Sequence, residues 1–191
     1  MLIQKTKGVH IMETKTHRIN IGGVTRDLPI VRISDSLSIA VLIMLTDVEL
    51  TVGCAKELLK KTPEFDIIIT AEAKGIPLAY EMARQSGKDY VVARKIRKLY
   101  MRDPVEVTVQ SITNAVPQKL ILDVDDVAKL KNKKVLIADD VISNGGSVEA
   151  LEELVGIAGG TVVGKAAALA EGEACSRDDI FYLGEIPLFF D

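Results

Sequence analysis

The sequence of 191 residues has only two cysteines and two histidines, the residues from which zinc centres and disulfide frameworks are built. Its two cysteines, Cys54 and Cys175, lie far apart, and neither has a second cysteine or a cluster of histidines near it. Zinc sites and disulfide scaffolds need such groups at short spacings. We therefore interpret both cysteines as packing residues, and we expect a cytoplasmic location.

Long apolar runs are also missing. The longest strongly apolar run covers residues 39–45, whereas a helix needs about 20 apolar residues to cross a bilayer. The first residues include Gln4, Lys5 and Lys7 and lack the apolar centre of a secretion signal. We expect neither secretion nor contact with a membrane.

An excess of charge is absent as well. The formal net charge of -3 argues against a broad nucleic-acid surface, which would need many more Lys and Arg residues. The apolar fraction of 48% and the charged fraction of 27% are near the averages for globular proteins. A chain of this length can bury one core. We expect a single domain over residues 1–191 and no nucleic-acid partner.

What the sequence does contain is an alternation of apolar runs with helix-period segments. Strands are predicted over residues 66–70, 90–93, 135–138 and 161–169, and helices over residues 47–61, 73–86 and 147–158. This alternation predicts a mostly parallel sheet covered by helices on both faces. Ligands of such sheets bind at the carboxyl ends of the strands, so the residues after each strand are the candidates for function.

Residues 94–116 break the alternation. The segment opens with several basic residues and continues with Val105, Val107 and Val109 at a spacing of two. We interpret it as a basic loop that leads into a β-ribbon flap. Residues 180–191 are predicted to form a last strand followed by an apolar end.

The most informative segment reads Val135-Leu-Ile-Ala-Asp-Asp-Val-Ile-Ser-Asn-Gly-Gly-Ser147. It combines a buried strand, two adjacent carboxylates and a turn of small residues that opens a helix. Small residues allow close approach of the backbone, and the start of a helix offers free N–H groups, which together suit a phosphate monoester. The residues predicted to hold this phosphate are Ser143, Asn144, Gly145, Gly146 and Ser147.

The two carboxylates, Asp139 and Asp140, accept hydrogen bonds and suit the hydroxyls of a ribose or a hydrated Mg²⁺ ion. A bare Asp-Asp or Gly-Gly pair is also compatible with an ordinary turn. The complete segment, however, lacks both the Gly-Lys pattern of a nucleoside triphosphate loop and the spaced glycines of a dinucleotide site. It resembles the 5-phosphoribosyl-1-pyrophosphate (PRPP) signature of type I phosphoribosyltransferases.

This resemblance covers roughly residues 64–170. Residues 66–77 and 90–99 are similar to the pyrophosphate loop and the flexible basic loop of adenine and xanthine phosphoribosyltransferases and of archaeal hypoxanthine/guanine enzymes. The resemblance implies an α/β fold with a mostly parallel sheet flanked by helices, a flexible flap, and a small base-binding hood to which residues 1–35 contribute.

The resemblance also implies a function. A purine-type enzyme would transfer the 5-phosphoribosyl group of PRPP to a purine base and release pyrophosphate, with Mg²⁺ as cofactor and a homodimer as the assembly. Adenine is the first expectation for the base. The alternatives are a hypoxanthine/guanine or xanthine phosphoribosyltransferase, a pyrimidine or orotate enzyme of the same superfamily, and a regulator that binds PRPP without catalysis.

The resemblance carries roles to particular residues. It implies that Asp139, Asp140 and Glu106 take part in catalysis and that Asp139 and Asp140 reach the metal through water or the ribose hydroxyls. Pyrophosphate would meet Ala71, Glu72, Ala73, Lys74 and Gly75, together with Arg94, Lys95 and Lys98. The base would meet Thr25, Arg26, Val141 and Glu171. Three simpler roles remain open: Glu72 as a residue that orients its loop, Glu171 as an exposed turn residue, and the basic run as a solvated surface loop.

Overall fold

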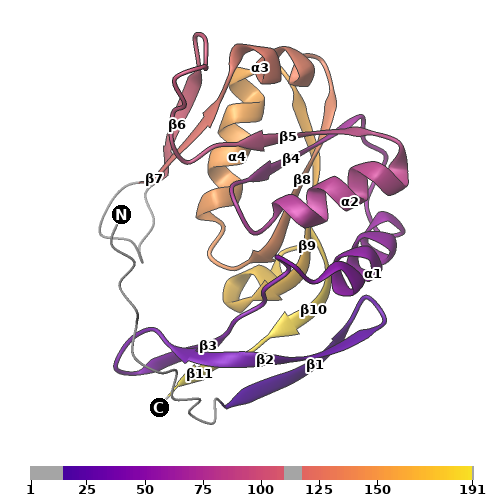
Figure 1. The fold of residues 1–191 in the computed structure, drawn as a ribbon, viewed down its shortest axis with the longest axis vertical. Helices are drawn as coiled ribbons and strands as arrows, with labels where there is room; N and C mark the ends of the chain where they lie inside the picture. The colour runs from indigo at the N-terminus through magenta and orange to yellow at the C-terminus, as the bar shows by residue number, and fades with distance from the viewer. Residues whose placement is uncertain (1–14, 110–117, 191) are drawn as a thin grey trace, which may run out of the picture.

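The computed structural model describes residues 15–109 and 118–190. Figure 1 shows a central sheet with its helices, a second sheet at one end of it, and a two-stranded ribbon. The tip of the expected flap at residues 110–117 and the first part of the expected hood at residues 1–14 lie outside the described residues.

The central sheet has five strands, and every neighbouring pair is parallel. Its order is β10-β9-β8-β4-β5. The strands are β4 (Ile67–Ala71), β5 (Asp89–Ala93), β8 (Lys134–Ile142), β9 (Thr161–Glu171) and β10 (Ile180–Ile186). The parallel sheet predicted from alternating strands and helices is therefore confirmed.

Helices cover both faces of this sheet (Figure 1). On one face, α1 (Val48–Leu59) and α2 (Ile76–Ser86) pack with Ile68 and Leu136 in one buried cluster. On the other face, α4 (Gly146–Ile157) packs with Ile69 and Ile137 in a second cluster. Successive strand residues point to opposite faces. Both faces of the sheet are therefore apolar, as the strand sequences require. A short helix, α3 (Val124–Leu130), was not predicted.

Two predicted boundaries are corrected. β8 continues to Ile142 instead of ending at residue 138, because Val141 and Ile142 pair with Leu169 and Ala170 of β9. Asp139 and Asp140 therefore lie inside the strand. α2 begins at Ile76 instead of residue 73, because the preceding three residues form the turn that leaves β4.

The second sheet corresponds to the hood. It is antiparallel, with the order β1-β2-β3-β11. Its strands are β1 (Thr16–Ile21), β2 (Val24–Arg32), β3 (Leu37–Ala40) and β11 (Leu188–Phe190). The hood predicted from residues 1–35 thus also includes β3 and a strand from the other end of the sequence. Figure 1 shows that β10 leads from the central sheet directly to this second sheet.

The β-ribbon predicted within residues 94–116 is confirmed in its first strand, and its second strand lies beyond the predicted segment. β6 (Val105–Val109) pairs with β7 (Gln118–Leu122), and the side chains of Val107 and Leu120 belong to the buried cluster under α4. Among the helices in the described part of the chain, none has the length and apolarity needed to cross a bilayer.

Candidate functional site

The candidate site lies where the strand order of the central sheet reverses. The chain passes outward from β4 to β5 and then returns to β8 on the opposite side of β4. In open α/β sheets, ligands bind at such a switch point, beyond the carboxyl ends of the two strands. Here the two segments that meet are residues 72–75, which follow β4, and residues 143–146, which follow β8. The two loops predicted from the sequence to bind pyrophosphate and phosphate are therefore neighbours.

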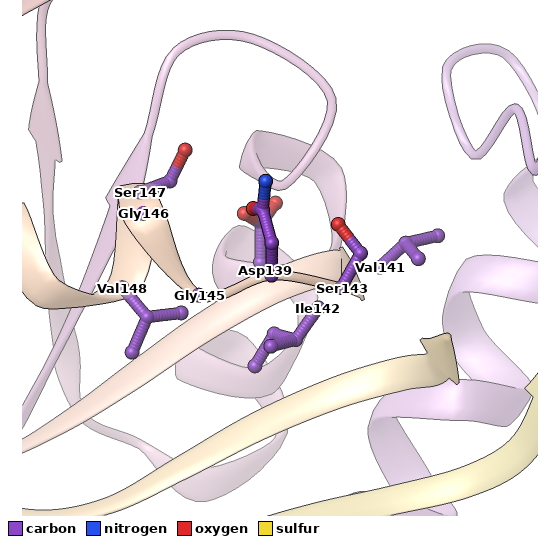
Figure 2. Close-up of a pocket in the computed structure, with 9 residues that line it drawn as sticks. Asp139, Val141, Ile142, Ser143, Gly145, Gly146, Ser147 and Val148 are labelled. Atoms are coloured by element: carbon purple, nitrogen blue, oxygen red, sulfur yellow. The ribbon is translucent and has the colours of Figure 1, made fainter. Parts of the chain in front are cut away.

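The segment after β8 forms a small polar hollow of about 50 Å³, lined by residues 139 and 141–148. Gly145 has φ +84°, a backbone conformation that other residues rarely adopt, and α4 begins at the next residue. The first N–H groups of α4 have no partners within the helix, so they are available to an anion. Figure 2 shows the Asp139 carboxylate and the hydroxyls of Ser143 and Ser147 around this hollow, while Ile142 and Val148 point away from them.

The two carboxylates have different surroundings. Asp140 is buried, and its Oδ2 accepts a hydrogen bond of 2.6 Å from Lys74 Nζ. Asp139 accepts a hydrogen bond of 2.9 Å from the backbone N–H of Asp140. Burial raises the pKa of Asp139 above its usual range, and the negative charge of Asp140 adds to that increase. The site thus holds two adjacent carboxyl groups and a single ammonium group between the two loops.

The turn after β4 packs tightly against these carboxylates. A Cβ atom on Gly75 would lie 2.4 Å from Thr70 Oγ1 and 2.7 Å from Asp139 Oδ1. Any larger residue at position 75 would push the turn away from β8. The hydroxyl of Thr70 is buried here without a hydrogen-bond partner among the described residues. Of the predicted pyrophosphate residues on either side of Glu72, Ala71 is the last residue of β4 and Ala73 lies in this turn.

Glu72 joins this turn to the basic loop. Its Oε2 accepts a hydrogen bond of 3.0 Å from the backbone N–H of Lys95, and its Oε1 lies 3.4 Å from Arg94 Nη1. The bond from Lys95 lowers the pKa of Glu72, and Arg94 and Lys98 lower it further. The backbone of Arg94 also pairs with Ile121 of β7. These contacts agree with the simpler role for Glu72, which is to orient the loop that carries the basic side chains.

A larger hollow of about 630 Å³ lies between the hood and residues 143–147, which were predicted to bind phosphate and are called the phosphate segment below. The hood contributes Ile33, Leu37, Ile39 and Leu188, and the segment that ends β9 contributes Glu171, Gly172 and Glu173. The phosphate segment completes the lining with Ser143, Asn144 and Ser147. The hollow therefore has an apolar wall on the hood side and a polar wall on the side of the sheet.

Glu171 is the predicted base-binding residue that this hollow contains. It is the last residue of β9, and burial raises the pKa of its carboxyl group while Lys74 partly opposes that shift. Sequence reasoning missed the apolar wall. Leu188 lies directly opposite Ile39 in the antiparallel pair of β11 and β3, and an apolar strand at each end of the sequence was the only available signal.

Other predicted residues lie elsewhere. Arg26 Nε donates a hydrogen bond of 2.7 Å to Asp47 Oδ2 and borders a separate hollow, and Thr25 precedes it in β2. Val141 borders the smaller hollow beside Asp139. Glu106 lies on the ribbon, where its Oε1 accepts a hydrogen bond of 2.6 Å from Lys119 Nζ. In the described part of the chain, Thr25, Arg26, Val141 and Glu106 do not line the larger hollow.

Comparisons with known proteins agree with this geometry. The chain is 35% identical over 103 residues to an adenine phosphoribosyltransferase of Bifidobacterium animalis subsp. lactis, a match that covers 54% of this chain and about half, 51%, of that relative. It is 33% identical over 128 residues to an adenine phosphoribosyltransferase of Cenarchaeum symbiosum, covering 66% of this chain and 72% of that one.

A solved structure shares the fold. The structure of adenine phosphoribosyltransferase from Thermoanaerobacter pseudethanolicus matches with a TM-score of 0.66 at 22% identity and covers 90% of this chain and 95% of that chain. A family model described as the phosphoribosyl transferase domain matches residues 52–184, which include both loops of the switch point. The chain therefore belongs to the phosphoribosyl transferase domain family.

Proposed function

We propose that this chain transfers the 5-phosphoribosyl group of PRPP to a purine base, with adenine as the preferred base, and releases pyrophosphate. The observation that carries the proposal is the meeting of three features at the switch point between β4 and β8. These are the phosphate segment, the carboxylates Asp139 and Asp140, and the lysine-bearing turn whose Lys74 binds Asp140. The relatives named adenine phosphoribosyltransferase support the choice of base.

In this proposal, each part of the site holds one part of PRPP. The 5-phosphate binds the segment from Ser143 to Ser147, where the start of α4 offers N–H groups to an anion. The ribose hydroxyls bind Asp139 and Asp140. Pyrophosphate binds residues 71–75 and the basic side chains of the neighbouring loop, Arg94, Lys95 and Lys98. Lys74 provides charge at this point but cannot form the two parallel hydrogen bonds of an arginine.

Mg²⁺ fits the donor set of this site as part of the substrate complex. No group of three or more His, Cys, Asp or Glu side chains in residues 15–109 and 118–190 could hold a metal by itself. Mg²⁺ is commonly bound by one or two carboxylates together with substrate phosphates. Asp139 and Asp140 would supply those carboxylates, directly or through water. When bound, the ion neutralises negative charge on the departing pyrophosphate.

In the proposed reaction, the main task of the protein is to position PRPP and the base. The bond between ribose C1 and the pyrophosphate oxygen breaks, and its electron pair leaves with pyrophosphate. A ring nitrogen of the base forms the new bond to C1, and the proton that this nitrogen carried is released to solvent. The fixed geometry of two loops at one edge of a rigid sheet brings the reactants together, and Lys74 with the basic loop stabilises the charge that develops on pyrophosphate.

The larger hollow is the proposed site of the base. Its apolar hood residues, with Ile39 and Leu188 as a paired surface, suit the faces of a purine ring. Glu171 on the opposite wall suits an exocyclic amine, because a carboxylate accepts hydrogen bonds from such a group. Adenine and guanine carry that amine, whereas hypoxanthine and xanthine do not. The proposed base site does not include Arg26 and Val141, which border other hollows, or Thr25, which does not line the larger hollow.

The expected homodimer also remains a proposal. The basic loop exposes three large apolar side chains, Ile96, Leu99 and Tyr100, and an exposed apolar group of this kind commonly marks a contact with another protein. A second copy would cover them and place the basic side chains at a subunit boundary. The cytoplasmic location, the lack of a nucleic-acid partner and the catalytic role of Glu106 stay predictions.

The test is to offer PRPP and Mg²⁺ with adenine, guanine, hypoxanthine, xanthine and uracil separately and to measure nucleotide formation. We expect turnover to be highest with adenine and to be lost in the Asp139→Asn/Asp140→Asn double variant. A preference for another base would replace adenine in the proposal. Inactivity with all five bases, despite measurable PRPP binding, would contradict catalysis and favour a PRPP-binding regulator.

A further inference from the structure

A network of charged side chains lies behind the phosphate segment, outside the residues assigned above. Lys165 on β9 is 7% exposed, and its Nζ lies 2.7 Å from Glu152 Oε1 of α4 and 2.5 Å from Asp179 Oδ2. Burial alone would lower the pKa of this lysine, but the two carboxylates outweigh it and raise the pKa. Lys165 therefore ties α4 to the segment between β9 and β10 as a charged group.

The same network ends at the phosphate segment. Arg177 uses Nε and Nη2 to donate two hydrogen bonds to Asp179, at 2.9 and 2.8 Å. This pairing fixes the plane of the guanidinium and leaves Nη1 directed toward the glycine turn. A Cβ atom on Gly145 would lie 3.1 Å from Arg177 Nη1 and 3.7 Å from Glu149 Oε1. The side chains of Arg177 and Glu149 therefore both lie close to Gly145, the N-cap of α4.

Without Arg177, the only charged side chain close to Gly145 among the described residues would be that of Glu149, which would disfavour a phosphate ligand. The phosphate segment, residues 143–147, contains no basic side chain. Glu149 occupies the first turn of α4, where its negative charge would repel a phosphate bound at the same helix end. Arg177 brings a positive charge to the same point and is held there by Asp179.

We propose that Arg177 is a positioning residue that raises the affinity of the segment for the 5-phosphate by offsetting the charge of Glu149 beside Gly145. The inference rests on the proposed function, because it needs a phosphate at this place. Arg177 is not among the residues that line the smaller hollow in the described chain, so it acts through the segment and not by touching the ligand.

The experiment is calorimetric titration of the full chain with ribose 5-phosphate at fixed ionic strength. We expect Arg177→Gln to weaken binding about three- to tenfold, the effect of a charge at a helix end. Glu149→Gln should tighten binding, and the Arg177→Gln/Glu149→Gln double variant should return to within about twofold of the wild type. Glu153→Gln is the matched control, because this exposed carboxylate lies on the same helix farther from its start, and it should leave the affinity for ribose 5-phosphate unchanged.

In turnover assays, Arg177→Gln should raise KM for PRPP and leave kcat and the KM for the base nearly unchanged.

The outcomes separate the two proposals. Failure of the wild type to bind ribose 5-phosphate would overturn the proposed function and this inference together. Wild-type binding with an unchanged Arg177→Gln variant would overturn the inference alone, as would a loss of affinity that Glu149→Gln does not reverse, since that result would mean a purely structural brace. If Arg177→Gln fails to fold, Glu149→Gln in the wild-type background decides, because an unchanged affinity there would also overturn the inference.

Discussion

At the scale of single residues, the buried carboxyl group of Asp139 in the candidate site should lower the free energy of unfolding at neutral pH. Asp139 lies within a strand of the central sheet, beside a second carboxylate, and burial raises its pKa. A proton is therefore bound more tightly by this carboxyl group in the folded chain than in the unfolded chain. Above the ordinary pKa of aspartate, about 4, the unfolded chain loses this proton, whereas the folded chain keeps it up to the raised pKa of Asp139. The free energy of unfolding should therefore decrease with increasing pH through this group.

Substitution of Asp139 should therefore have opposite effects on activity and on stability. Asp139→Asn should abolish nucleotide formation and yet raise the free energy of unfolding at pH 7 by about 1 kcal/mol, because the wild-type carboxyl group must take up a proton or bury its charge when the chain folds, and the amide does neither. The gain should shrink toward pH 4, where the wild-type carboxyl group is protonated in both states. Urea unfolding monitored by circular dichroism at several pH values measures the effect. Asp89→Asn, at an exposed position, is the control, and a stability loss at pH 7 in Asp139→Asn would contradict the argument.

At the scale of elements, the N-cap residue of α1 also joins this helix to the hood. Asp47 is the N-cap of α1, and its Oδ1 accepts a hydrogen bond of 3.1 Å from the backbone N–H of Leu50. Both carboxylate oxygens also accept hydrogen bonds from Arg26 of β2. The bonds from Arg26 lower the pKa of Asp47. The residue predicted to meet the base thus has an architectural contact in this structure.

Two substitutions at Asp47 separate the cap from the ion pair. Asp47→Ala should lower the free energy of unfolding by about 1 kcal/mol through loss of the cap alone. Asp47→Asn keeps a capping oxygen and should cost less. Because the folded-state pKa is lowered, the contribution of the charge is present above the usual pKa of aspartate and is lost as the pH falls below about 4. The difference between wild type and Asp47→Asn should therefore vanish at low pH in thermal unfolding, and Asp27→Asn, at an exposed ion pair of 3.9 Å, is the control.

At the scale of the whole molecule, a close backbone contact joins the hood to α1, between Gly22 and Gly53. The turn between β1 and β2 packs on α1, where a Cβ atom on Gly53 would lie 2.2 Å from the carbonyl oxygen of Gly22. Neither atom belongs to a flexible side chain, so any added group must move the hood. The larger hollow is lined by residues of the hood and of the central sheet with its loops, so its shape depends on this contact between Gly22 and Gly53.

The same chemical change should therefore have opposite signs at two helical glycines. Gly53→Ala should lower the free energy of unfolding by about 1–3 kcal/mol through overpacking and should raise KM for the base more than KM for PRPP. Gly156→Ala in α4 has nothing within 4 Å of the new atom and should stabilise the chain by up to about 1 kcal/mol. Chemical unfolding of both variants with steady-state kinetics measures these effects. Equal stability changes at the two positions would contradict a close contact between Gly53 and Gly22.

Much of the central sheet could be predicted because its signals are local. A strand buried on both faces, such as β4, must be a run of apolar residues, and the helices between strands carry their own period. Boundaries were less predictable where pairing decides them: β8 extends to Ile142 only because β9 continues beside it. β3 and β11 were missed as partners because a short apolar segment does not name the strand with which it pairs.

The sequence by itself determined the class of the sheet and the position of the predicted phosphate segment, since a run of apolar residues and a glycine turn before a helix are local properties. The tertiary structure alone decided which charges meet. Lys74 binds Asp140 from 66 residues away, and Arg177 reaches Gly145 from beyond β9. It also decided that Ile39 and Leu188 share one wall of the larger hollow. Such contacts depend on strand order and on the packing of the hood, which are global properties that no local pattern of residues specifies.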